Sequence, residues 1–82
     1  MEPIQEGNDV FLHDGDKAVG AVREIHKHEI VVYVENAGDF TVPMSAVKEV
    51  VAGKVVLDRA QLSQHMREAI AGEHRAEDSR LG

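Results

Sequence analysis

The sequence contains no cysteine, and this absence removes three kinds of chemistry at once. A disulfide framework, a thiolate metal site and a cysteine nucleophile are all excluded. With 82 residues, the chain is near the lower size limit for a single self-sufficient hydrophobic core, so we expect one domain. Without disulfides, the stability of that domain must come from packing.

Aromatic residues are scarce as well: Phe11, Tyr33 and Phe40 are the full set, so the core must be built from Val, Ile, Leu and Met. No apolar run approaches the roughly 18 to 20 residues of a membrane helix, so we expect no membrane span. The N-terminal segment is acidic and lacks the apolar stretch of a signal peptide. The expected location is therefore cytoplasmic.

Positive charge is also in short supply. The formal net charge is −6 with histidine neutral, and it resides in residues 1–58, where five Lys/Arg face eleven Asp/Glu. Proteins that bind nucleic acid normally present a basic surface to the phosphates. Nucleic acid is therefore an unlikely partner.

Short runs rich in Val and Ile, punctuated by Gly, Asn, Asp and Pro, are the main feature of residues 1–58. Such runs predict strands, and the short connections between them favour antiparallel neighbours. The expected strands cover residues 9–13, 18–26, 29–35, 39–44, 47–52 and 54–58. The predicted fold is mainly β: a small antiparallel β-barrel of about six short strands with one C-terminal α-helix.

The stretch HDGDKAVGAV, residues 13–22, has the acidic and glycine content of a ligand-binding loop. A calcium loop would need further acidic ligands where Lys17 and Ala18 stand, and a phosphate loop would lead into a helix. We therefore interpret Asp14 and Gly15 as a tight turn, with Gly15 among the residues able to adopt a positive φ.

Four further residues are assigned structural roles. The spacing of Val19, Val22 and Ile25 does not fit one face of a regular strand, which predicts a β-bulge at or near Gly20. The other breaks between strands are expected at Gly38, Pro43 and Gly53.

The segments DGDKAVGAVREI and FTVPMSAVKEVVAGKVVLD, within residues 6–58, resemble the PRC-barrel domain family, in particular small stand-alone bacterial members of uncharacterised function. The resemblance implies a β-barrel that docks onto other macromolecules, and it implies no catalytic residues.

Residues 59–82 are expected to form a C-terminal helix and a charged, flexible tail. The helix is predicted over about 59–71, with Asp58 as N-cap and Gly72 as the stop. One side of this helix carries Leu62, Met66 and Ile70. This apolar stripe could pack on its own barrel or on another chain.

In the third strand, Ile30, Val32 and Val34 alternate with Val31 and Tyr33, which places the latter two on the outer face. The candidate interaction surface therefore comprises Val31, Tyr33, Leu62, Met66 and Ile70.

Catalytic and metal sites are not indicated. Ser45 and Ser63 lack the context of a catalytic nucleophile, and the five histidines have no spacing that brings three ligands together. We expect no catalytic residue, no cofactor and no metal ligand.

Two functions remain, and both are non-enzymatic. The first is a protein-interaction (docking) module; the alternative is a self-assembling structural protein that uses the C-terminal helix and the outer face of the barrel. Metal binding by histidines is a distant third.

Overall fold

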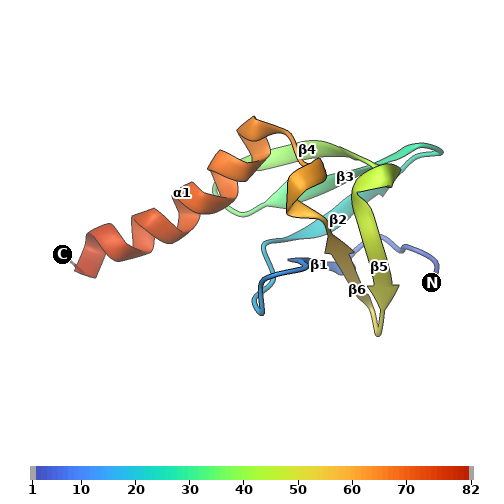
Figure 1. The fold of residues 1–82 in the computed structure, drawn as a ribbon, viewed down its shortest axis with the longest axis horizontal. Coiled ribbons are helices and arrows are strands. Elements are labelled where there is room, and N and C mark those ends of the chain that lie inside the picture. Colours follow the sequence, from blue (N-terminus) through green and yellow to red (C-terminus); the bar gives the residue numbers. More distant parts are fainter. Residues whose placement is uncertain (1, 82) are drawn as a thin grey trace.

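A computed structural model describes the backbone of residues 2–81 and the side chains of residues 2–72. Six strands form one sheet and a long helix follows (Figure 1). The strands are β1 (Asp9–Leu12), β2 (Gly20–Ile25), β3 (Glu29–Val34), β4 (Gly38–Pro43), β5 (Val47–Val51) and β6 (Lys54–Leu57). The 3₁₀ turns are η1 (Met44–Ala46) and η2 (Arg59–Gln61), and the helix is α1 (Gln64–Leu81). The prediction of a mainly β fold with six short strands and a C-terminal helix is confirmed.

The sheet is mixed, so the prediction of purely antiparallel pairing is wrong. Its strand order is β4-β3-β2-β1-β6-β5, and β1 pairs with β6 in parallel, with Val10 opposite Val55. Strands β1 to β4 follow one another as antiparallel neighbours. The chain then crosses through η1 to the opposite edge, where the β5–β6 hairpin is added. Because this connection is not a hairpin, it does not impose an antiparallel direction.

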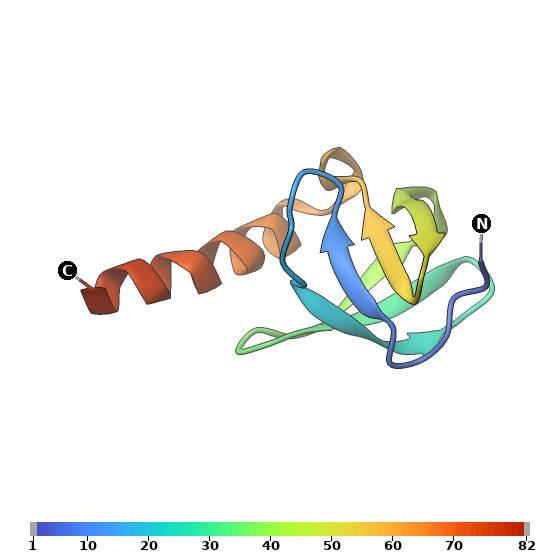
Figure 2. The same cartoon turned by 90° about the horizontal axis from the view of Figure 1, so that it is seen from below.

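The sheet curves around its core without closing, so the predicted barrel is also wrong. Strands β4 and β5 are the two ends of the sheet, and Figure 2 shows the strands wrapping around a common interior. The turns η1 and η2 lie across the open side: the Met44 amide donates to the His28 carbonyl, and the Asp58 amide donates to the Ala46 carbonyl. Strands of four to six residues leave a gap, which non-strand segments fill.

The concave face of the sheet forms the hydrophobic core. Ile30, Val32 and Val34 are fully buried, as their alternation predicted, and Val42 is buried beside them on β4. The other strands contribute Val10, Leu12, Val22, Val50, Val55 and Leu57. Leu62, Met66 and Ile70 complete the core from the C-terminal segment.

The C-terminal helix begins and ends later than predicted. The Asp58 carboxylate accepts from the Ala60 amide and so caps η2, after which Leu62 is extended. A new helix then starts, with the Ser63 hydroxyl accepting from the Met66 amide. The helix continues through Gly72, which does not adopt a positive φ, to Leu81. The expectation of a flexible tail concerns residues 73–82, whose side chains lie outside the described part.

The predicted turn residues are confirmed only in part. Gly38 and Gly53 adopt φ values of 97° and 75°, and Ala52 joins Gly53 with φ 53° in a tight hairpin turn. Gly15 does not have a positive φ, but its amide donates to the Leu12 carbonyl and closes a tight turn that includes Asp14, after which the loop continues to Val19. Pro43 ends β4 at the sheet edge, where it removes no internal ladder bond.

Gly20 has a different role from the one predicted. The register shift between β2 and β3 lies between Val22 and Glu24, so the bulge is centred on Arg23. At Gly20 an added Cβ would overlap the carbonyl oxygen of Tyr33. Glycine is required there because two backbones approach closely.

Gly20→Ala should therefore destabilise the fold by about 3 kcal/mol, the upper end of the usual cost of overpacking. Gly15→Ala is the matched control, since its Cβ would meet nothing closer than 3.8 Å and its φ is not positive. Urea unfolding of both variants tests this. Equal stability of the two variants would contradict the close approach at Gly20.

Candidate functional site: the convex face and two hollows

The loop formed by residues 13–19 is fastened to η2 by an ion pair. Arg59 donates from Nε and Nη2 to the two carboxylate oxygens of Asp14, with both distances at 3.2 Å. The Arg59 hydrogen bond, together with its positive charge, lowers the pKa of the Asp14 carboxyl from its ordinary value of 3.8. Asp14 is a turn residue and also links the loop to η2, 45 residues later in the sequence.

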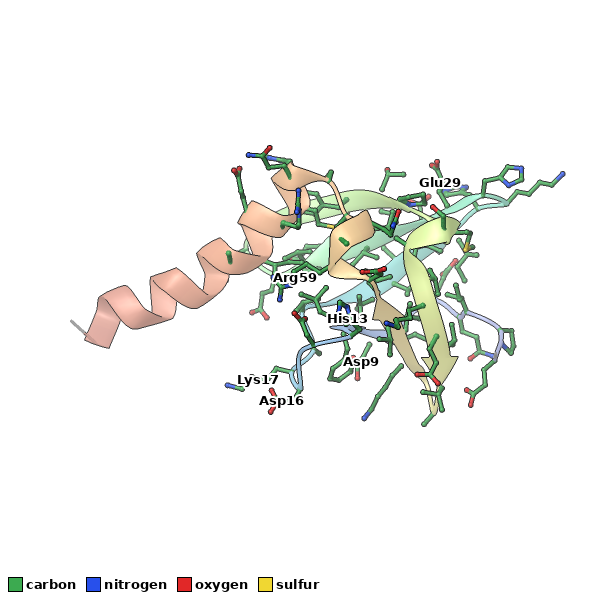
Figure 3. All side chains as sticks on the ribbon, in the orientation of Figure 1. Asp9, His13, Asp16, Lys17, Glu29 and Arg59 are labelled. Carbon is green, nitrogen blue, oxygen red and sulfur yellow. The ribbon has the colours of Figure 1, made fainter. Side chains whose placement is uncertain are left out.

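A hollow of about 350 Å³ lies between this loop and the second turn of α1. Leu12, Val19, Ile70 and Ala71 supply its apolar lining, and Gly15, Asp16, Lys17 and Arg59 complete it. Figure 3 shows Asp16 and Lys17 at the tip of the loop, pointing away from the sheet. With Arg59 tied to Asp14, this hollow has apolar walls and nearly balanced charge.

Three of the five residues in the predicted interaction surface are buried. Leu62, Met66 and Ile70 have exposures of 5%, 1% and 3%, because their side chains cover the open side of the sheet. In α1, the His65 ring also lies against Phe40 of β4, with ring centroids 5.4 Å apart. The helix stripe therefore packs on its own sheet and is not an accessible surface.

The remaining two residues, Val31 and Tyr33, lie on the convex face as predicted. Tyr33 is 38% exposed and Val31 is half-buried. Strand registers place Tyr33 opposite Ala21, Ala21 opposite Asp9, and Asp9 opposite Lys54. The row continues to Asp39 on β4 and Val51 on β5, so it crosses all six strands. We define the convex face as this row together with the neighbouring apolar residues Val31, Phe11 and Val56.

Cations lie over both aromatic rings of the convex face. The Arg23 guanidinium carbon is 5.5 Å from the centre of the Tyr33 ring, and its Nε is 3.6 Å from an Asp39 carboxylate oxygen. The Lys54 ammonium is 5.1 Å from the centre of the Phe11 ring. These contacts partly cover two aromatic rings that would otherwise be exposed to water on this face of the sheet.

A second hollow, of about 270 Å³, opens on the convex face beside Tyr33. We call it the Tyr33 cleft; it is lined by Asp9, Ala18, Val19, Gly20, Ala21, Tyr33 and Glu35. Sequence reasoning did not single out Asp9 or Glu35. Alternation along β3 could have placed Glu35 near the Tyr33 face, but Asp9 joins it only through the order of the strands.

Two of the histidines lie near carboxylates. His26 Nε2 is 3.1 Å from a Glu24 carboxylate oxygen, and His13 Nδ1 is 3.9 Å from one of Asp58. Over residues 2–72, no three side chains of His, Asp or Glu converge closely enough to hold a metal ion. The His74 side chain lies outside the described residues.

Comparison with known proteins supplies no relative: no family model, curated protein or solved structure matches this chain. Within its described part, the chain has no helix with the length and apolar character of a membrane span.

The Asp14–Arg59 pair predicts a specific titration. The lowered pKa of Asp14 means that the pair stabilises the folded loop at pH values above about 3.8, and that this contribution is lost as the pH falls through the lowered pKa. Arg59→Gln should return the Asp14 pKa toward its ordinary value. Carboxyl NMR titration of both proteins measures this shift.

Arg67→Gln on the exposed side of α1 is the matched control, and it should leave the Asp14 titration unchanged. An Asp14 titration that is insensitive to Arg59→Gln would show that the ion pair does not form in solution.

Proposed function

We propose that this protein is a non-enzymatic docking module that binds another protein through the convex face of its sheet. The observation that carries the proposal is the exposure of Tyr33, with Val31 beside it, on the face of the sheet opposite the core. Tyrosine is enriched at protein interfaces because it combines a large rigid ring with a polar hydroxyl. A sheet surface also holds such side chains at fixed spacing.

The resemblance of residues 6–58 to the PRC-barrel domain supports the same proposal, because that family docks onto other macromolecules. The family assignment remains a prediction. A cytoplasmic location, expected from the sequence, is part of the proposal.

The two hollows also favour docking over chemistry. Their volumes, about 350 and 270 Å³, are near or below the lower end of the range for small-molecule sites, roughly 300 to 1,000 Å³. Two larger depressions, of about 530 and 470 Å³, are shallow and lie on the surface of β5 and along α1. Asp16 is the carboxylate that lines the larger hollow, and the neighbouring Asp14 is held ionised by Arg59, which does not suit Asp14 to act as a general acid near neutral pH.

Self-assembly is the second candidate, and one observation favours it. Strand β4 (Gly38–Pro43) ends the sheet, so its outer edge has no neighbouring strand among the described residues. Such an edge can pair with a strand of a second copy. Since the helix stripe is buried, self-assembly would use this edge or the convex face in place of Leu62, Met66 and Ile70.

The combined variant Val31→Thr/Tyr33→Thr tests the docking proposal. Both substitutions introduce threonine, a β-branched residue that favours strands, so the fold should persist. The apolar contact surface is lost. We expect the amount of each protein that cross-links to the wild type in cells to fall by at least about tenfold with this variant, which corresponds to a loss of about 1.4 kcal/mol of binding free energy.

Ile25→Thr is the matched control, because Ile25 is 38% exposed at the end of β2 and, opposite the core residue Ile30, faces the other side of the sheet. Identical cross-linked proteins for all three chains would refute docking through Val31 and Tyr33. A fall in solution mass with the double variant would instead support self-assembly.

A further inference from the structure

We propose that the Tyr33 cleft receives an arginine or lysine side chain from a basic segment of the partner protein. This inference rests on the proposed docking function and adds the chemistry of the partner. Three features of the cleft support it: its size, its charge and its aromatic wall.

The size of the cleft suits one extended side chain. Its volume of about 270 Å³ is below the usual range for a bound small molecule. The residues Ala18, Val19, Gly20 and Ala21 line it without long side chains. Gly20 contributes only backbone to the lining, and an added Cβ there would point at the Tyr33 carbonyl oxygen and the core side chain of Val32.

The charge of the cleft is negative. Asp9 and Glu35 are its charged lining residues, and among the side chains of residues 2–72 neither takes part in a salt bridge. Lys54 is opposite Asp9 in the strand register, but its ammonium lies over the Phe11 ring. A cation entering the cleft would therefore meet two carboxylates that no described basic side chain neutralises, on a domain with net charge −6.

The aromatic wall already binds a cation of this kind. Arg23 places its guanidinium over the Tyr33 ring and its Nε near the Asp39 carboxylate. Arg23 is not among the residues that line the cleft, so its guanidinium does not fill the cleft itself. A partner arginine between Tyr33, Asp9 and Glu35 would repeat the combination of ring, guanidinium and carboxylate that the chain forms internally.

Other occupants fit less well. Phosphate-bearing ligands would be repelled by the two carboxylates, and the cleft supplies fewer than the three protein ligands that a bound metal ion normally needs. The charge complementarity thus favours a basic protein segment.

The test is an NMR titration with two probes of nearly the same shape. N-acetylarginine amide carries the guanidinium, and N-acetylcitrulline amide replaces it with a neutral urea group. At constant ionic strength, the arginine probe should shift the amide signals of Gly20, Ala21 and Tyr33, and the citrulline probe should not. Equal shifts from both probes, or none from either, would overturn the inference.

Two double variants that remove the same amount of charge test whether Asp9 and Glu35 bind the probe. Asp9→Asn/Glu35→Gln should weaken binding of the arginine probe by about tenfold, which corresponds to the loss of two exposed charge pairs. Glu29→Gln/Glu49→Gln removes the same charge away from the cleft and should have little effect; Figure 3 shows Glu29 well separated from Asp9. If both variants weakened binding equally, the effect would come from net charge alone, and a specific site would be refuted.

Failure of this inference can be told apart from failure of the docking proposal. If Asp9→Asn/Glu35→Gln loses the arginine probe but keeps every cross-linked partner, the partner does not use the cleft and the inference is wrong while docking stands. If the arginine probe binds but Val31→Thr/Tyr33→Thr keeps its partners, docking through the convex face is wrong. A solution mass that falls with Asp9→Asn/Glu35→Gln would identify the occupant as a second copy and overturn the assignment to another protein.

Discussion

The rest of the structure depends on one constraint: a curved six-stranded sheet that does not close must have its concave face covered by something else. Leu62, Met66 and Ile70 provide that cover, and all three are nearly inaccessible to water. Because η2 ends at Gln61 and α1 begins at Gln64, the extended residue Leu62 lies in the break between two helical segments. The helix is therefore part of the core of this small domain, where each buried side chain of this size contributes about 2–5 kcal/mol.

Because the concave face is covered, the two sides of the sheet have different roles. The inner side is apolar and sealed, while the outer side combines exposed Tyr33 with charged residues that are held in register across the strands. The positions of Asp9 and Tyr33 on this outer side are set by backbone pairing, so a partner would meet a largely preformed surface. Gly20 belongs to both sides, since its close approach to the Tyr33 carbonyl oxygen holds β2 against β3 and its backbone lines the Tyr33 cleft.

The sequence predicted the features that depend on local pattern. Valine-rich runs and turn residues located the strands, and alternation in β3 separated Ile30, Val32 and Val34 from Val31 and Tyr33. It did not predict the parallel pairing of β1 with β6, because that depends on where the chain goes after η1. It could not place Asp9 and Glu35 in one cleft, because that depends on the exact registers of β1 with β2 and of β2 with β3. The helix start was misplaced because Asp58 and Ser63 are both good capping residues, and each caps a different segment.

The measurement that most directly tests this account is the urea unfolding of two shortened chains, one ending at Gly72 and one at Ser63. The first keeps Met66 and Ile70, and we expect it to unfold cooperatively with nearly the stability of the full chain. The second lacks both residues, and the loss should consume most of the roughly 5–15 kcal/mol available to a domain, leaving no cooperative transition. If the chain ending at Ser63 were as stable as the chain ending at Gly72, α1 would not be part of the core. The helix stripe would then again be available as an interaction surface.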